Sequence, residues 1–342
     1  MTDATASAIP PAELDVVAVG NAIVDVIAHA DEAFLVEHEL AKGSMRLIDT
    51  EQAGRLYDAM GPGSESSGGS AANTMAGVAG LGGRAGFVGK VRDDQLGEVF
   101  AHDIKAIGVE FVSPPAAEGP PTATCLILVT PDAQRTMNTY LGTAGLLTPD
   151  DIDPAFIASA EVTYGEGYLW AEPGAKAALT HAFATARAAG RRTAFTLSDS
   201  FCVDQNRAEF LELLDGHVDI VFANEAEICS LFEVDSFDAA LAEVRSRPGT
   251  WALTRSSRGS VVVADGVVHV VAAAHVEHVV DTTGAGDLYA AGFLFGLTHG
   301  LGFGDCARLG GIAAAEIISH VGARPEVALT DLVPVDLRVL LT

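Results

Sequence analysis

The chain has 342 residues, of which 49% are hydrophobic and 19% are charged, and these proportions favour a compact folded protein over a disordered one. No apolar run approaches the roughly 20 residues of a membrane span, and the first residues lack the basic and apolar regions of an export signal, so we expect a cytoplasmic protein. The net charge of −26 disfavours nucleic acid and anionic membranes as partners. A bound phosphate would have to rely on local arginines, backbone N–H groups and helix N-termini.

Apolar runs alternate with helical patterns along most of the chain. The first apolar run, 15–20, ends in glycine, as expected of a buried parallel strand. Later patterns predict strands at 85–90, 162–165, 193–197 and 220–223 and helices at 96–106, 174–189 and 207–214. This alternation predicts an α/β protein with a mostly parallel central sheet and helices on both faces.

Two stretches break the alternation, at about 27–61 and 121–141, and we expect them to form a small β-rich lid on a single domain spanning 1–342. Towards the C-terminus, strands are predicted at 250–254, 260–264 and 267–271, and helices at 285–298 and 303–321. The last two strands are joined by Asp265-Gly266, a hairpin signal.

The segment 281–287 reads D-T-T-G-A-G-D and comes directly before a predicted apolar helix. Glycines in such a loop let backbone N–H groups approach an anion at a helix N-terminus, where the macrodipole favours negative charge. A carboxylate in the first helical turn, Asp287, could accept the proton of an attacking hydroxyl at the same point. An ordinary strand-to-helix turn fits the local pattern equally well.

This segment resembles the second signature of the PfkB, or ribokinase-like, family of carbohydrate and nucleoside kinases. The first signature is matched by G-G-S-A-A-N at 68–73 and its continuation through 80–97. Two further family motifs fall in order along the chain, G-N-A-I-V-D at 20–25, before the first signature, and N-E-A-E at 224–227, before the second. Ordered motifs are more specific than one glycine-rich loop. The resemblance implies a three-layer ribokinase-like fold and ATP-dependent phosphorylation of a hydroxyl.

The resemblance also implies roles for individual residues. The base would be Asp287, with Gly284, Ala285 and Gly286 as the anion hole. The acceptor would be bound by Asn21, Ile23, Asp25, Gly68, Gly69, Asn73, Cys125 and Met137. The nucleotide would be bound by Asn224, Glu227, Thr254, Ser256 and Gly259, with Glu227 reaching Mg²⁺ through water and Asp281 beside a K⁺ ion.

Structural explanations compete with several of these roles. Asn224 and Glu227 have the spacing of a helix capping box. Core packing would explain Ile23, Cys125 and Met137 equally well. A ligand-binding regulator on a kinase scaffold is disfavoured because all the carboxylates and amides of the motifs are present.

Within the family, the flanks of the lid segments resemble those of adenosine kinases, at 31–35, 42–45 and 121–125. Arg135 matches an arginine that reaches towards the transferring phosphate in such enzymes, although a solvated hairpin arginine is the plainer alternative. Thr283 and Gly311 depart from the pattern of some of these enzymes. We expect the 5′-phosphorylation of a nucleoside, adenosine first, by ATP and Mg²⁺, with K⁺ dependence, in a monomer or homodimer. The alternative is ribokinase or another sugar kinase of this family.

Overall fold

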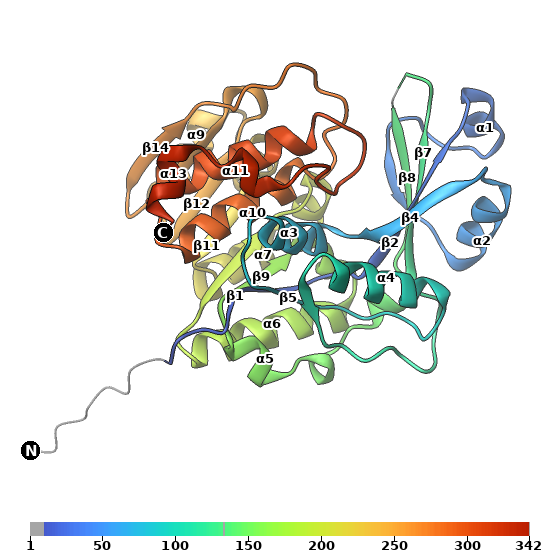
Figure 1. Ribbon diagram of the computed structural model, residues 1–342, viewed down its shortest axis with the longest axis horizontal. Coiled ribbons are helices and arrows are strands. Elements are labelled where there is room, and N and C mark those ends of the chain that lie inside the picture. Colours follow the sequence, from blue (N-terminus) through green and yellow to red (C-terminus); the bar gives the residue numbers. More distant parts are fainter. Residues whose placement is uncertain (1–9, 133, 342) are drawn as a thin grey trace, which may run out of the picture.

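The computed structural model describes residues 10–132 and 134–341, and within them nine strands form one large sheet (Figure 1). In spatial order the strands are β14 (Val267–Val271), β13 (Ser260–Ala264), β12 (Thr250–Thr254), β11 (Ile220–Asn224), β10 (Arg192–Thr196), β9 (Ala160–Glu166), β1 (Leu14–Val19), β5 (Ala85–Val88) and β6 (Val109–Phe111). The strands from β12 to β6 pair in parallel, and β13 and β14 are antiparallel additions at one edge. The predicted α/β class with a mostly parallel sheet is confirmed.

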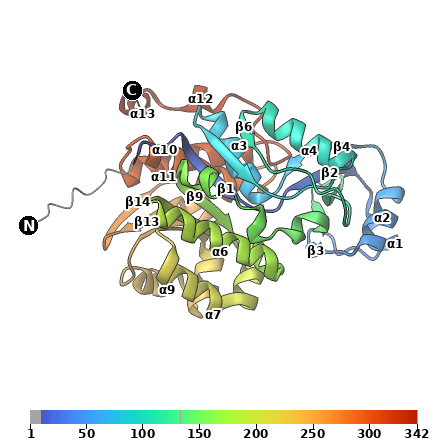
Figure 2. The ribbon, with the colours of Figure 1, turned by 90° about the horizontal axis from the view of Figure 1, so that it is seen from below.

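Helices cover both faces of this sheet, which explains why its strands are continuous apolar runs (Figure 2). Val16 and Ala18 of β1 join the core beneath α3, α4, α10 and α11, while Val17 and Val19 point to the other face. None of the described helices combines the length and apolarity needed to cross a membrane. The helices on the first face are α3 (Ser70–Gly80), α4 (Gln95–Ala106), α10 (Ala285–Thr298) and α11 (Phe303–Ile317); those on the second are α5 (Pro154–Ala158), α6 (Pro173–Ala188), α7 (Ser200–His217), α8 (Glu225–Phe232) and α9 (Phe237–Val244).

A second sheet of five strands projects from one side of the larger body and carries two helices, α1 (Glu32–Glu37) and α2 (Thr50–Ala59) (Figure 1). Its spatial order is β3 (Met45–Leu47), β8 (Arg135–Tyr140), β7 (Ala123–Val129), β2 (Ile23–His29) and β4 (Gly63–Gly68). The sheet thus extends beyond both ends of the predicted segment 27–61. That it acts as a lid stays a prediction.

Short elements complete the chain. They are the 3₁₀ helices η1 (Gly142–Leu146), η2 (Pro149–Asp151), η3 (Gly167–Ala171) and η4 (Ser256–Arg258) and the C-terminal helices α12 (Leu329–Leu332) and α13 (Val335–Leu340).

Two predicted helices have wrong boundaries. The helix predicted over 207–214 is the second part of α7, which begins at Ser200 after the N-cap Asp199. Asn206 has non-helical dihedral angles inside α7, and this kink interrupts the apolar pattern. The helix predicted over 303–321 ends at Ile317, because the carbonyl of Ile318 accepts hydrogen bonds from the N–H groups of Val280 and Asp281 instead.

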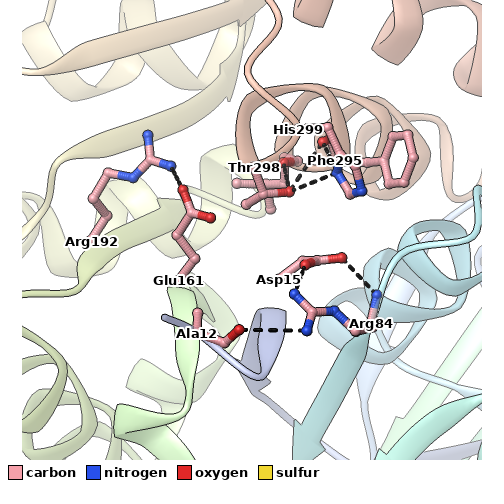
Figure 3. Close-up of polar contacts among 9 residues, drawn as sticks. Ala12, Asp15, Arg84, Glu161, Arg192, Phe295, Thr298 and His299 are labelled. Carbon is pink, nitrogen blue, oxygen red and sulfur yellow. Dashed lines mark hydrogen bonds and ion pairs between the residues drawn. The ribbon is translucent and has the colours of Figure 1, made fainter. Parts of the chain in front are cut away.

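Polar contacts tie the amino ends of neighbouring strands together (Figure 3). Arg84 donates to the carboxylate of Asp15 at 2.7 Å, which joins β5 to β1. Arg192 of β10 forms an ion pair with Glu161 of β9. Both pairs lie at the amino ends of their strands.

Candidate active site

A cavity of about 460 Å³ opens at the carboxyl ends of the parallel strands, where it also meets the second sheet. In open α/β sheets, ligands bind outside these strand ends. The larger sheet contributes residues that end or follow five of its strands, namely Asn21, Glu166, Thr196, Asn224 and Thr254. The second sheet contributes a mostly apolar wall made of Ile23, Met45, Leu47, Cys125, Ile127 and Met137.

The N-terminus of α10 forms one part of the cavity. Its N-cap, Gly284, has a left-handed φ of 78° that favours glycine, and it has no side chain with which to cap the helix. Gly284 and Gly286 line the cavity, so the positive end of the helix dipole faces it. This arrangement can accommodate an anion, as the sequence predicted.

Asp287 lies in the first turn of α10, where both of its carboxylate oxygens accept hydrogen bonds. The donors are the Ser70 hydroxyl at 2.6 Å and the Asn73 amide at 3.1 Å, both from the first turn of α3. Burial raises the pKa of Asp287, while these two hydrogen bonds and the positive charge of Arg324 act in the opposite direction. The carboxylate is therefore oriented by protein donors and made more basic by its surroundings.

Asp25 lies on β2 and faces the same cavity. It packs against the backbone of Gly68, where an added Cβ would be 2.4 Å from its carboxyl carbon. Burial raises the pKa of Asp25 to about 6, a shift that Arg324 and Arg135 reduce and that the charge of Asp287 increases. Two carboxylates thus share one cavity.

Glu166, at the end of β9, was not among the predicted site residues. One carboxylate oxygen accepts hydrogen bonds from the backbone and side-chain amides of Asn21, at 2.8 and 2.9 Å. The other accepts the N–H of Ala71 at 2.7 Å, which caps α3 because its N-cap, Gly69, has no side chain. Burial raises the pKa of Glu166 to about 7, against the effect of these donors. The sequence signal that could have indicated Glu166 as a site residue is its position as an acid at the end of a buried strand.

Asn224 and Glu227 form a capping box at the N-terminus of α8, which is the structural alternative that their spacing predicted. Glu227 N–H donates to the Asn224 side chain at 2.9 Å, and Asn224 N–H donates to the Glu227 carboxylate at 3.0 Å. Both residues also line the cavity, and burial raises the pKa of Glu227 to about 7. The box therefore holds a carboxylate at the cavity wall, and the structural and the ligand-binding roles are compatible.

Arg135 and Asp281 form a buried ion pair with an N–O distance of 2.7 Å. The alternative of a solvated Arg135 is wrong, since its side chain is 6% exposed. Within the described residues, its Nε and Nη2 atoms have no hydrogen-bond partner. The Asp281 carboxylate also accepts the N–H groups of Thr283 and Gly322, both at 3.0 Å. The K⁺ role of Asp281 stays a prediction.

The cavity gathers most, but not all, of the predicted site residues. Those that line it are Asn21, Ile23, Asp25, Gly69, Asn73, Cys125, Met137, Asn224, Glu227, Thr254, Gly284, Gly286 and Asp287. Those absent from its lining are Gly68, Ala285, Arg135, Ser256, Gly259 and Asp281. Polar residues in the lining that sequence reasoning missed include Ser70, Thr139, Glu166, Tyr168, Thr196, Ser198, Thr282 and Tyr289.

Comparisons with known proteins agree with this geometry. A family model described as pfkB family carbohydrate kinase matches residues 14–329. A solved structure of adenosine kinase from Sinorhizobium meliloti is 53% identical, with a TM-score of 0.88 over 94% of this chain and 98% of that one. A probable sugar kinase from Rhizobium etli is 47% identical, with a TM-score of 0.88 over 94% and 97%.

A curated relative carries a different substrate name. The ATP-dependent ribose-1-phosphate kinase of Halopiger xanaduensis is 30% identical over 75% of this chain and 83% of its own length. These relatives share phosphorylation chemistry but differ in the acceptor that they are named for. The extent of the family match and the ordered motifs around the cavity lead to one assignment: the chain belongs to the PfkB family of carbohydrate kinases.

Proposed function

We propose that this kinase is an adenosine kinase, which transfers the γ-phosphoryl group of ATP to the 5′-hydroxyl of adenosine and produces AMP and ADP. The observation that carries the acceptor assignment is the apolar wall beside Asp25. The similarity to the adenosine kinase of Sinorhizobium meliloti supports it.

The apolar wall suits a nucleoside better than a free sugar. Next to the two carboxylates, the cavity is lined by Ile23, Met45, Leu47, Cys125, Ile127, Met137 and Leu141. A flat base can cover this surface, and burying it is favourable by about 25 cal/mol per Å². A free hexose would instead turn hydroxyls towards groups that cannot hydrogen-bond, which costs about 1–3 kcal/mol for each unpaired group.

The polar part of the cavity has the groups that the transfer requires. Asp287 would accept the proton of the 5′-hydroxyl, held in place by Ser70 and Asn73. The two oxygens of Asp25 match two neighbouring ribose hydroxyls, since one carboxylate can accept both. The N-terminus of α10 would stabilise the negative charge of the transferring group.

The nucleotide half of the cavity fits a magnesium ion that arrives with ATP. Within the described residues, no three His, Cys, Asp or Glu side chains gather to hold a metal directly. Glu227 stands alone at the wall with its oxygens bonded to Asn224, so it suits contact through water rather than direct coordination. Magnesium would neutralise charge on the phosphates when bound. We further propose that the second sheet closes over the acceptor and excludes water.

A coupled ADP-release assay with adenosine, inosine, ribose, fructose and ribose 1-phosphate tests the proposal. We expect kcat/KM for adenosine to exceed that for ribose by roughly a hundredfold, because ribose leaves the apolar wall uncovered. The main rival is a sugar kinase, which the 47% identity to the probable sugar kinase of Rhizobium etli supports. A higher kcat/KM for ribose or fructose than for adenosine would overturn our assignment and favour that rival.

A further inference from the structure

Arg324 lies between α11 and α12 and reaches back to the segment that joins β4 to α3. Its Nε and Nη2 atoms donate to the Ser67 carbonyl at 3.0 and 2.7 Å. Nη2 also donates to the Ser67 hydroxyl at 2.8 Å, and Nη1 donates to the Ala72 carbonyl at 3.0 Å. One planar guanidinium therefore fixes both ends of the segment 68–71, which is a geometry that lysine cannot reproduce.

The segment between these two carbonyls contacts two of the carboxylates that line the cavity, those of Asp25 and Asp287. Gly68 packs against the carboxyl group of Asp25, and Ser70 donates to Asp287. A shift of this segment would therefore move the surface under Asp25 and the donor to Asp287 together. Arg324 itself is absent from the cavity lining, so it would act through these neighbours rather than on a substrate.

The charge of Arg324 reaches the same two carboxylates. It lowers the pKa of both Asp25 and Asp287, against the effect of burial. The other charges around this group are Arg135, which also favours ionised Asp25; Asp103, which accepts the Ser67 hydroxyl; and Glu166 and Glu227, whose pKa values the charge of Asp287 raises. Among the described residues, Arg324 is thus the positive group whose charge lowers the pKa of both acids.

We infer that Arg324 is a positioning residue for phosphoryl transfer: its planar guanidinium holds the segment 68–71, which contacts Asp25 and Asp287, under the acceptor. This inference rests on the proposed function only in needing the two carboxylates to act on one acceptor. It does not depend on which acceptor that is. A purely structural arginine would contribute to folding and leave the ionisation of the site unchanged.

The test separates the charge of Arg324 from its fork. Arg324→Gln removes both, and Arg324→Lys keeps the charge. Arg338→Gln is the matched control, because Arg338 also donates to backbone carbonyls, those of Val333, Thr330 and Asp331, but lies outside the cavity lining. For each protein, kcat and KM are measured from pH 5 to 9 with whichever acceptor the wild type phosphorylates best, and folding is followed by thermal denaturation.

For Arg324→Gln we expect the acid limb of kcat/KM to move up by about one pH unit. We expect its acceptor KM to rise roughly tenfold while the KM for ATP stays unchanged. Arg324→Lys should keep the acid limb of kcat/KM at its wild-type position, but its acceptor KM should rise as it does in Arg324→Gln. Arg338→Gln should change only the melting temperature.

An unshifted limb in Arg324→Gln would overturn the electrostatic role, and a wild-type acceptor KM in Arg324→Lys would overturn the positioning role. If Arg324→Gln does not fold, the acceptor KM of Arg324→Lys still tests the positioning role. An acid limb of kcat/KM in Arg324→Lys that lies one pH unit above that of the wild type would refute the electrostatic role. A wild-type preference for a free sugar would refute the proposed function alone.

Discussion

The proposed acceptor half of the cavity, around Asp25, Glu166 and Asp287, and the proposed nucleotide half, around Asn224 and Glu227, are held together in different ways. In the acceptor half, the polar contacts join residues far apart in the chain: Glu166 binds Asn21 across 145 positions, and Ser70 binds Asp287 across 217. In the nucleotide half, Asn224 and Glu227 are three positions apart and form a local capping box. The acceptor half therefore depends on the assembled fold, whereas the nucleotide half depends mainly on one helix end. Substitutions in the two halves should differ in kind as well as in size.

The largest expected effect comes from removing the carboxylate of Asp287, to which Ser70 and Asn73 donate in the acceptor half. Asp287→Asn keeps the size of the side chain but cannot accept a proton, so we expect kcat to fall by about 10²–10⁴-fold. Steady-state kinetics of ADP release measures this loss. Asp305→Asn is the matched control, since Asp305 occupies the first turn of α11 outside the cavity lining. Near-normal turnover in Asp287→Asn would exclude Asp287 as the base.

Glu166→Gln tests the long-range contacts of the acceptor half. A glutamine has one acceptor oxygen, so either Asn21 or Ala71 loses its partner, at a cost of about 1–3 kcal/mol. We expect kcat/KM for the acceptor to fall roughly tenfold to a hundredfold, with the KM for ATP nearly unchanged.

The control for this change is Glu161→Gln on the same strand, whose side chain pairs with Arg192 at the far end of the sheet (Figure 3). Equal effects of the two substitutions would mean that the acceptor half has no special dependence on Glu166.

Acidification should also act on the acceptor half. Asp25 has a pKa of about 6 and is expected to work ionised, so activity is present above this pH and is lost as the pH falls through it. We expect kcat/KM at pH 5 to be about tenfold lower than at pH 8. A pH profile that stays flat from 8 to 5 would contradict the assigned role of Asp25.

Stability should change with pH in the opposite direction. The folded-state pKa values of Asp25, Glu166 and Glu227, about 6, 7 and 7, lie above their ordinary values of 3.8, 4.5 and 4.5. The folded chain therefore holds more protons than the unfolded chain within this window, and these groups lower the free energy of unfolding as the pH rises through it. Thermal denaturation across the same pH range measures this contribution, and its slope should become shallower in Glu166→Gln.

The smallest effect is expected for the local contact of the nucleotide half. Glu227→Ala removes one side of the capping box, so we expect the KM for ATP to rise about fivefold, equivalent to about 1 kcal/mol, while the acceptor KM is unchanged. The control is Gln52→Ala, because Gln52 holds the same position in the capping box of α2 as Glu227 holds in that of α8. This change should leave the KM for ATP unaffected. An acceptor KM that rises as much as that for ATP would show that the two halves are not independent.

The same contrast explains how much the sequence could predict. Asp287 and Glu227 could be predicted as site residues because each lies within a short motif that resembles one of the family, although the donors to Asp287 lie 214 and 217 positions away. Glu166 and Arg324 were missed because their partners lie 95 to 257 positions away, and no local pattern indicates such contacts. The parallel sheet was predictable because its buried strands are apolar runs. The kink of α7 at Asn206 and the early end of α11 were not, since tertiary contacts determine them.

The order of synthesis gives the Arg324 contact one more consequence. Ribosomes make proteins from the N-terminus, and residue 324 is added only after every described strand, the last of which ends at Val271. The bonds from Arg324 to Ser67 and Ala72 cannot form earlier, so incomplete chains released before this point would lack that support for the segment 68–71. Prematurely terminated products should therefore be poor kinases even where the strands of both sheets have already been translated.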